Sequence, residues 1–245
     1  MRRPYVFSVK KLKSLLLFFS LGFVSMDYSL GKRDEHVFLL HGLARSSSSM
    51  KGMERFLKDH NFSVTNLDYP SRKFPIPELA KQVRERISEN PKSRSAEKIH
   101  FVTHSMGGIL LRQIQSVDPL PNIGKAVMLG PPNQGSEIVD KLGKMKIFKM
   151  INGPASLQLG TDPESIPNIL GPVNFELFVI AGTRSINPIL SQMIPGTDDG
   201  KVAVARTGIQ GMQEFLEVQS AHPFLMNNRI AREATLHFLK TGQLP

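Results

Sequence analysis

From residue 36 onward, short apolar runs alternate with segments of helix length, and this alternation limits the fold more than any other feature of the sequence. Strands that are apolar on both faces and separated by helices are typical of a parallel sheet with helices on both sides. We therefore predict an α/β fold with a mostly parallel central sheet, formed by one domain over residues 32–245. The predicted strands are residues 36–40, 63–68, 99–102, 125–129, 175–181 and 214–218, and the predicted helices are residues 50–60, 78–90, 106–115 and 229–240.

Residues 137–174 break this alternation, because their apolar residues follow neither the period of a strand nor that of a helix. Five apolar residues crowd into seven positions from Met145 to Ile151, which is more than one helix face can bury. We predict a small insertion after the fourth strand, over one end of the sheet. Two interpretations stay open: a surface helix with a loop, or a mobile apolar cover over an acyl pocket, formed by residues 145–172.

The first 31 residues have the features of a targeting segment. Residues 1–13 are basic and contain no acid, and residues 14–26 form one apolar run of thirteen. That run is shorter than the roughly 20 residues of a membrane span and fits the apolar region of a signal peptide. We expect residues 1–31 to be a signal peptide, cleaved after Gly31, or an uncleaved N-terminal membrane anchor; a buried helix of the domain is the third alternative. The protein is then exported, as a secreted or periplasmic protein, or membrane-anchored.

The chain carries 31 Lys and Arg against 21 Asp and Glu, a net charge of +10. Residues 1–31 account for +4 of this charge, and the basic residues that follow are interleaved with acids. No basic run alternates with aromatic residues, so we expect no nucleic-acid partner. An anionic membrane surface stays open as a partner. The absence of Cys excludes a disulfide framework, a thiolate metal site and a Cys nucleophile.

The strongest local motif is THSMGG, residues 103–108, between the third predicted strand and the helix that follows it. A serine at such a turn has a strained backbone and projects its hydroxyl above the carboxyl end of the sheet. We therefore predict that Ser105 is a nucleophile. Small residues two before and two after the serine let the chain turn. Gly107 meets this requirement, whereas the β-branched Thr103 makes the turn tighter.

A second motif, HGLA at residues 41–44, directly follows the first strand. A glycine here allows backbone N–H groups to face the nucleophile, and acyl transfer needs such donors for the oxyanion that forms. We predict that the N–H groups of Leu43 and Met106 form the oxyanion hole. The alternative is that Gly42 only allows the chain to enter a helix.

The third motif is an acid followed by a base. Asp198 and Asp199 follow the fifth strand, and His222 follows the sixth, so Ser, Asp and His occur in the order expected of a triad on such a sheet. His222 is the one histidine in a loop at the carboxyl end of a strand, and we expect it to be the base. His104 adjoins Ser105 but is expected to point to the other side of the turn. We expect structural or surface roles, or no base role, for His36, His41, His60, His100 and His237.

The motifs HGLA, THSMGG, LGPPNQGSE, DDGKV and SAHPFLMN, in this order and spacing, resemble those of the α/β-hydrolase superfamily, and within it those of small bacterial lipases and carboxylesterases. The resemblance covers residues 36–240. It implies a Ser105–Asp199–His222 triad, the oxyanion hole named above and activity on carboxylic esters with neither cofactor nor metal. For the loop at residues 131–136 we expect a structural role, with Ser136 capping the helix that follows.

Asp199 is preferred to Asp198 as the triad acid. Adjacent side chains in an extended stretch point to opposite sides, so we expect only one of the two to reach His222. Gly200 lets the chain turn directly after Asp199, and the separation of 23 residues from His222 resembles that of the family. We expect Asp198 to accept backbone N–H groups of the turn or to face solvent.

We predict a monomeric serine hydrolase that acts on an ester or lipid substrate through an acyl-enzyme. The same triad would also serve an acyltransferase, a thioesterase or an amidase, and the sequence does not separate these activities. A hydrolase-fold binding protein without catalytic activity is the alternative from another class.

Overall fold

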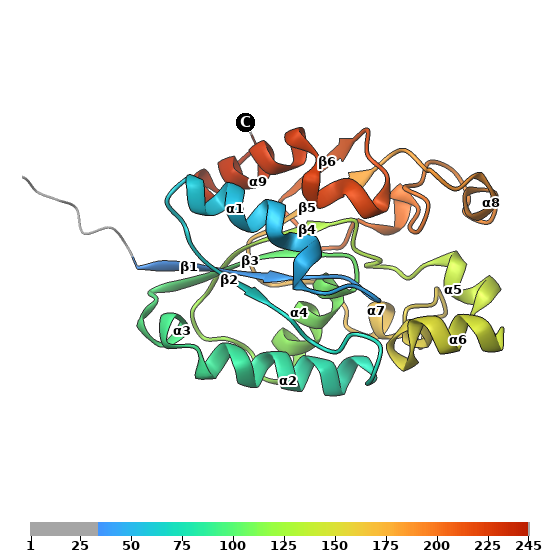
Figure 1. Ribbon diagram of the computed structural model, residues 1–245, viewed down its shortest axis with the longest axis horizontal. Coiled ribbons are helices and arrows are strands. Elements are labelled where there is room, and N and C mark those ends of the chain that lie inside the picture. The colour runs from blue at the N-terminus through green and yellow to red at the C-terminus, as the bar shows by residue number, and fades with distance from the viewer. Residues whose placement is uncertain (1–33, 245) are drawn as a thin grey trace, which may run out of the picture. The chain divides into compact units, whose positions relative to one another are not determined.

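The structure, a computed structural model, describes residues 34–244 and confirms the predicted α/β fold (Figure 1). The predicted signal peptide or anchor, at residues 1–31, lies outside the described residues. In the described part, no helix is long and apolar enough to cross a membrane. The described residues form six strands, which are all parallel and lie in the order β2-β1-β3-β4-β5-β6. They are β1 (Glu35–Leu40), β2 (Ser63–Leu67), β3 (Lys98–His104), β4 (Ile123–Leu129), β5 (Leu177–Gly182) and β6 (Glu214–Val218).

Helices cover both faces of the sheet, as the apolar strands predicted. Helices α1 (Lys51–Asp59) and α9 (Arg229–Thr241) lie on one face, and α2 (Ile76–Glu89) and α4 (Met106–Val117) lie on the other (Figure 1). Successive residues of a strand point to opposite faces. In β1, Val37 and Leu39 therefore pack with the α1 and α9 layer, whereas Phe38 and Leu40 pack with the α2 and α4 layer.

Helix α2 ends before Pro91, as predicted, but a short helix that the sequence analysis did not predict begins there. Pro91 is the first residue of α3 (Pro91–Ser95), where its missing N–H leaves no helical hydrogen bond unmade. The side chain of Asn90 accepts a hydrogen bond from the N–H of Lys92 and caps this helix.

Residues 137–174 form the predicted insertion between β4 and β5. Its helices are short: α5 (Glu137–Leu142), α6 (Lys146–Asn152), the 3-10 helix η2 (Pro154–Gln158) and α7 (Ile166–Ile169). The expectation that Ser136 caps α5 through its side chain is wrong. The Ser136 hydroxyl donates instead to the carbonyl of Lys201, at 2.7 Å, and so ties the start of the insertion to the loop after β5.

The remaining helices lie in connections between other elements. The 3-10 helix η1 (Ser47–Met50) directly precedes α1, α8 (Pro188–Ser191) and the 3-10 helix η3 (Val204–Arg206) lie between β5 and β6, and the 3-10 helix η4 (His222–Asn227) lies between β6 and α9. Helix α8 lies at the same end of the molecule as α5 and α6, beyond the carboxyl ends of the strands (Figure 1).

Arg112 of α4 holds the insertion against the body of the domain. Its side chain is buried, and its guanidinium donates to the carbonyls of Asn133 at 3.0 Å, Pro167 at 2.8 Å and Gly171 at 2.8 Å. No carboxylate of the described residues pairs with it, and burial lowers the pKa of Arg112 to about 10. These carbonyls lie in the loop after β4 and in the last part of the insertion, so one side chain fixes both.

We predict that Arg112→Leu lowers the free energy of unfolding by at least about 2 kcal/mol, because the carbonyls of Pro167 and Gly171 lose their donor inside the protein. Urea denaturation measures this change. Arg55→Leu is the matched control, since Arg55 is exposed, and its effect is expected to stay within about 0.5 kcal/mol. An equal decrease of the free energy of unfolding in the two variants would show that Arg112 does not hold the insertion to the domain.

Candidate active site

Ser105 occupies the sharp turn between β3 and α4. Its backbone has φ 54° and ψ −124°, a conformation that residues other than glycine rarely adopt. The turn is held by two backbone hydrogen bonds, from Ser105 N to the carbonyl of Leu129 at 2.9 Å and from Gly108 N to the carbonyl of Ser105 at 3.0 Å. The side chain of Ser105 is partly exposed and lines a cavity. The structure thus has the strained turn that the motif predicted.

Glycine is required at two places beside this turn. A Cβ atom on Gly107 would lie 2.6 Å from the carbonyl oxygen of Leu40 and 2.8 Å from that of His41, because α4 begins directly against the end of β1. A Cβ atom on Gly42 would lie 3.1 Å from the Cβ of Ser105. The loop after β1 therefore approaches Ser105 closely, and a side chain at position 42 would meet it.

Of the two predicted oxyanion donors, Leu43 lines the cavity at Ser105 and Met106 directly follows Ser105 in the chain. Leu43 is partly buried, and Met106 is the first residue of α4. Among the described residues, neither the Leu43 N–H nor the Met106 N–H has a protein acceptor. Both N–H groups are therefore free to donate to a bound oxygen.

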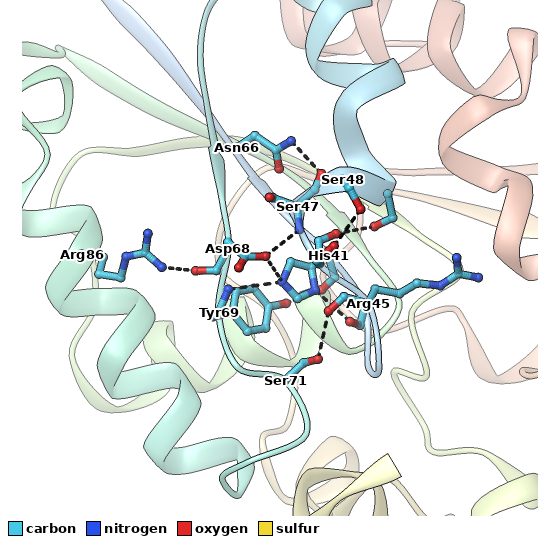
Figure 2. Close-up of polar contacts among 12 residues, drawn as sticks. His41, Arg45, Ser47, Ser48, Asn66, Asp68, Tyr69, Ser71 and Arg86 are labelled. Atoms are coloured by element: carbon cyan, nitrogen blue, oxygen red, sulfur yellow. Dashed lines mark hydrogen bonds and ion pairs between the residues drawn. The ribbon is translucent and has the colours of Figure 1, made fainter. Parts of the chain in front are cut away.

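A buried histidine and tyrosine fix the loop that carries Leu43 (Figure 2). The ring of His41 stacks on that of Tyr69, with centroids 4.0 Å apart. His41 Nδ1 donates to the carbonyl of Gly42 at 2.9 Å, Nε2 accepts from the N–H of Tyr69 at 3.3 Å, and the Tyr69 hydroxyl donates to the His41 carbonyl. Burial lowers the pKa of His41, which favours the neutral ring that these contacts need.

Polar residues at the end of β2 and just after it hold the rest of this loop (Figure 2). The carboxylate of Asp68 accepts from the N–H of Ser47 at 2.8 Å, the amide of Asn66 donates to the carbonyl of Ser47 at 2.9 Å, and the Ser71 hydroxyl donates to the carbonyl of Arg45 at 3.3 Å. The loop is thus fastened at several points along residues 41–49, which keeps the Leu43 N–H in place.

The structure brings His222 and Asp199 together. Nδ1 of His222 donates to Oδ2 of Asp199 at 2.6 Å, and both side chains are buried. The other oxygen of Asp199 accepts from the N–H groups of Lys201 at 3.0 Å and Val202 at 2.9 Å. These bonds leave Nε2 of His222 as the acceptor nitrogen of the ring, and the His222 side chain lines the same cavity as Ser105.

Asp198 points elsewhere. Its carboxylate accepts from the N–H of Gly200 at 2.6 Å and from the hydroxyl of Ser191 at 2.5 Å. Asp198 therefore closes the turn and binds α8, and the structure places Asp199, not Asp198, against the imidazole.

The expectation that His104 points away from the site is wrong. Its Nε2 donates to the carbonyl of His222 at 3.0 Å, and the two rings lie 4.7 Å apart. His104 is fully buried, its Nδ1 has no partner among the described residues, and burial lowers its pKa well below the usual value. A neutral His104 thus links the turn at Ser105 to the loop that carries His222. Sequence reasoning missed this contact because nothing local in the THSMGG motif shows which way the ring turns.

These residues surround a mostly apolar cavity of about 230 Å³. The insertion supplies one wall, and Arg45 and Lys201 contribute the basic side chains. Within residues 34–244, no cluster of His, Asp or Glu has the composition of a metal site. The lining residues are Leu43, Arg45, His104, Ser105, Pro132, Ser136, Ile138, Val139, Phe148, Asn152, Leu159, Lys201, Val202, His222 and Pro223.

The sequence matches one family of known proteins. The profile of a family described as palmitoyl protein thioesterase matches residues 36–162, about half of the chain. This range includes β1 to β4, the turn at Ser105 and most of the insertion. A comparison with curated proteins gave no match.

Solved structures share the fold of this chain. The lipase BlEst2 of Bacillus licheniformis, in its mature form, covers 85% of this chain and 91% of its own, with 16% identity and a TM-score of 0.62. The thioesterase RedJ, from the prodiginine biosynthetic pathway in Streptomyces coelicolor, covers 86% and 91%, with 14% identity and a TM-score of 0.51.

The phospholipase PlaB of Legionella pneumophila also shares the fold, with 18% identity and a TM-score of 0.61. The match covers 85% of this chain, which spans a little more than half (57%) of PlaB. Identities this low show a common fold, that of the α/β-hydrolases.

We predict that Gly107→Ala destabilises the protein by about 1–3 kcal/mol, because the added methyl group meets two backbone oxygens that cannot move away. Gly108→Ala is the control, since its methyl group meets the flexible side chain of Met128 at 3.0 Å. Unfolding in urea compares the two variants. A Gly107→Ala variant as stable as Gly108→Ala would contradict the close approach of α4 to β1.

Proposed function

Since this chain belongs to the palmitoyl protein thioesterase family and is an α/β-hydrolase, we propose that it is a serine hydrolase that cleaves carboxylic esters through an acyl-enzyme. The observation that carries the proposal is the 2.6 Å hydrogen bond between buried Asp199 and His222, at a cavity that Ser105 also lines from a strained turn. A nucleophile, a base and a residue that orients the base are the groups that acyl transfer by serine requires.

In the proposed reaction, His222 Nε2 takes the proton of the Ser105 hydroxyl as the oxygen attacks the acyl carbonyl. Asp199 keeps the other ring nitrogen protonated and stabilises the imidazolium that forms. The carbonyl oxygen becomes an oxyanion, to which the N–H groups of Leu43 and Met106 donate. His222 then gives its proton to the leaving oxygen, the alcohol departs, and the acyl group remains on Ser105. Water, activated in the same way, releases the acid and restores the serine.

A thioester is the second candidate substrate. The family whose profile matches is described as a thioesterase family, and the same groups would release a thiol in place of an alcohol. The cavity is smaller than the roughly 300–1,000 Å³ usual for ligand pockets, which favours short acyl chains unless the insertion moves. Values of kcat/KM for oxygen esters and thioesters of the same acyl groups, in a series of chain lengths, decide between the two linkages.

We predict that Ser105→Ala abolishes hydrolysis of both kinds of ester, because a triad protease loses about 10⁶ in kcat without its serine. A fluorophosphonate probe should label the unchanged protein at Ser105 and leave the variant unlabelled. Melting curves should coincide, since the Ser105 hydroxyl makes no hydrogen bond to any other residue from 34 to 244. Activity above about a hundredth of the original, or labelling at another residue, would contradict the assignment of the nucleophile.

We predict opposite results for the two neighbouring aspartates. Asp199→Asn should lower kcat by about 10⁴, because His222 loses the acceptor that fixes its tautomer. Asp198→Asn should keep kcat within about tenfold, since Asp198 contacts Gly200 and Ser191 and not the imidazole. Steady-state kinetics of the two variants test this contrast. A disabled Asp198 variant beside an active Asp199 variant would reverse the assignment.

A further inference from the structure

Helix α6 exposes apolar side chains beside the cavity that contains Ser105. None of its residues is buried. Met150 is 76% exposed and Ile147 is 56% exposed, and Met145, which precedes the helix, is 50% exposed. Phe148 of the same helix lines the cavity, so the helix forms a wall of the site on one side and an apolar surface on the other.

Exposed apolar side chains also occur at α8, at the same end of the domain (Figure 1). Ile186, just before α8, is 66% exposed, and Ile189 of α8 is 69% exposed. The segments around α5, α6 and α8 pack on one another through a small apolar cluster that includes Phe148 and Leu190. The ammonium of Lys141 also donates to the carbonyl of Met193 at 2.7 Å. Residues 144–151 and 184–190 are therefore connected at one end of the domain, and we call these two segments together the basic apolar rim.

The charges of these segments have one sign. Lys141, Lys144, Lys146 and Lys149 lie between Asp140 and Asp162, and no acid lies between those two aspartates. Arg184 is the single charged residue from position 177 to position 197. In α1 and α2, by contrast, basic and acidic residues are interleaved. Exposed apolar groups surrounded by Lys and Arg suit the interface of a bilayer with anionic lipids, which attract basic residues while the apolar groups enter the headgroup region.

We propose that the basic apolar rim docks on an anionic lipid bilayer. In this orientation Met150, Ile147 and Ile189 enter the interface, the Lys side chains contact anionic headgroups, and the opening of the cavity faces the lipid. The proposal goes beyond ester cleavage, since binding requires neither Ser105 nor His222. Two alternative partners for the exposed apolar groups are a second copy of this chain and the N-terminal apolar segment of residues 14–26.

The absence of cysteine makes a direct test simple. Met150→Cys in the full-length chain, labelled with a fluorophore that responds to polarity, reports the environment of α6. Val117→Cys is the matched control, because Val117 is 72% exposed and lies at the far end of α4 from Ser105. We expect emission at position 150 to shift to the blue with vesicles of phosphatidylcholine and phosphatidylglycerol, more weakly at high salt, and not with phosphatidylcholine alone. Position 117 should give no shift.

Charge variants of the full-length chain complete the test, again read from the dye at position 150. The triple variant Lys144→Gln, Lys146→Gln, Lys149→Gln should weaken the affinity for anionic vesicles about a hundredfold, because each Lys near such a surface usually contributes to the free energy of binding. The control Lys81→Gln, Lys98→Gln, Lys240→Gln removes the same charge from exposed sites elsewhere and should change the response less than threefold.

Three results would overturn the proposal. Equal weakening by both triple variants would show attraction through net charge alone. Vesicle binding with no spectral change at position 150 would assign binding to the N-terminal segment. A dye that is already in an apolar environment without vesicles would show that a second copy or the chain's own N-terminus covers the rim. Each result concerns binding, so none depends on the outcome of the activity measurements.

Discussion

The positive φ of Ser105 is the constraint on which the arrangement of this site depends. The parallel sheet brings the loops after β1, β3, β5 and β6 to one edge. A residue between β3 and α4 reaches above that edge only through a sharp turn, and such a turn leaves no room for neighbouring side chains. Gly107 lets α4 begin against the end of β1, and Gly42 lets the loop after β1 approach Ser105 closely. The same approach brings the loop that carries Leu43 beside Ser105.

The fold and most site candidates could be predicted because local sequence determines them. The strands are apolar on both faces, and the predicted strands agree with the observed ones to within a few residues. Asp199 could be separated from Asp198 because adjacent side chains of an extended stretch diverge and Gly200 follows Asp199. In the structure Gly200 has φ 92° and the two carboxylates do diverge. The structure places Asp199 against His222, which agrees with that reasoning, while the catalytic roles of these residues stay predictions.

The remaining features depend on contacts between distant residues, which local patterns do not show. Tyr69 fixes His41 across 28 residues, and His104 contacts His222 across 118. The helices of the insertion follow no clear period, because α6 buries none of its residues and Arg112 holds the insertion through backbone carbonyls. Because α6 contributes only the partly buried Phe148 to an apolar cluster, it carries no clear amphipathic pattern by which to predict it, and its exposed apolar residues are the basis for the proposed bilayer contact.

In the proposed mechanism, Ser105 carries the acyl group during turnover. Rapid-quench mass spectrometry with a p-nitrophenyl ester tests it most directly, because release of the activated alcohol outpaces hydrolysis of the acyl-enzyme in such substrates. We expect a burst of one p-nitrophenolate per active site, together with one acyl group on the peptide that contains Ser105. Turnover with the acyl group on another residue, or with no burst and no acylated peptide at any time, would contradict it.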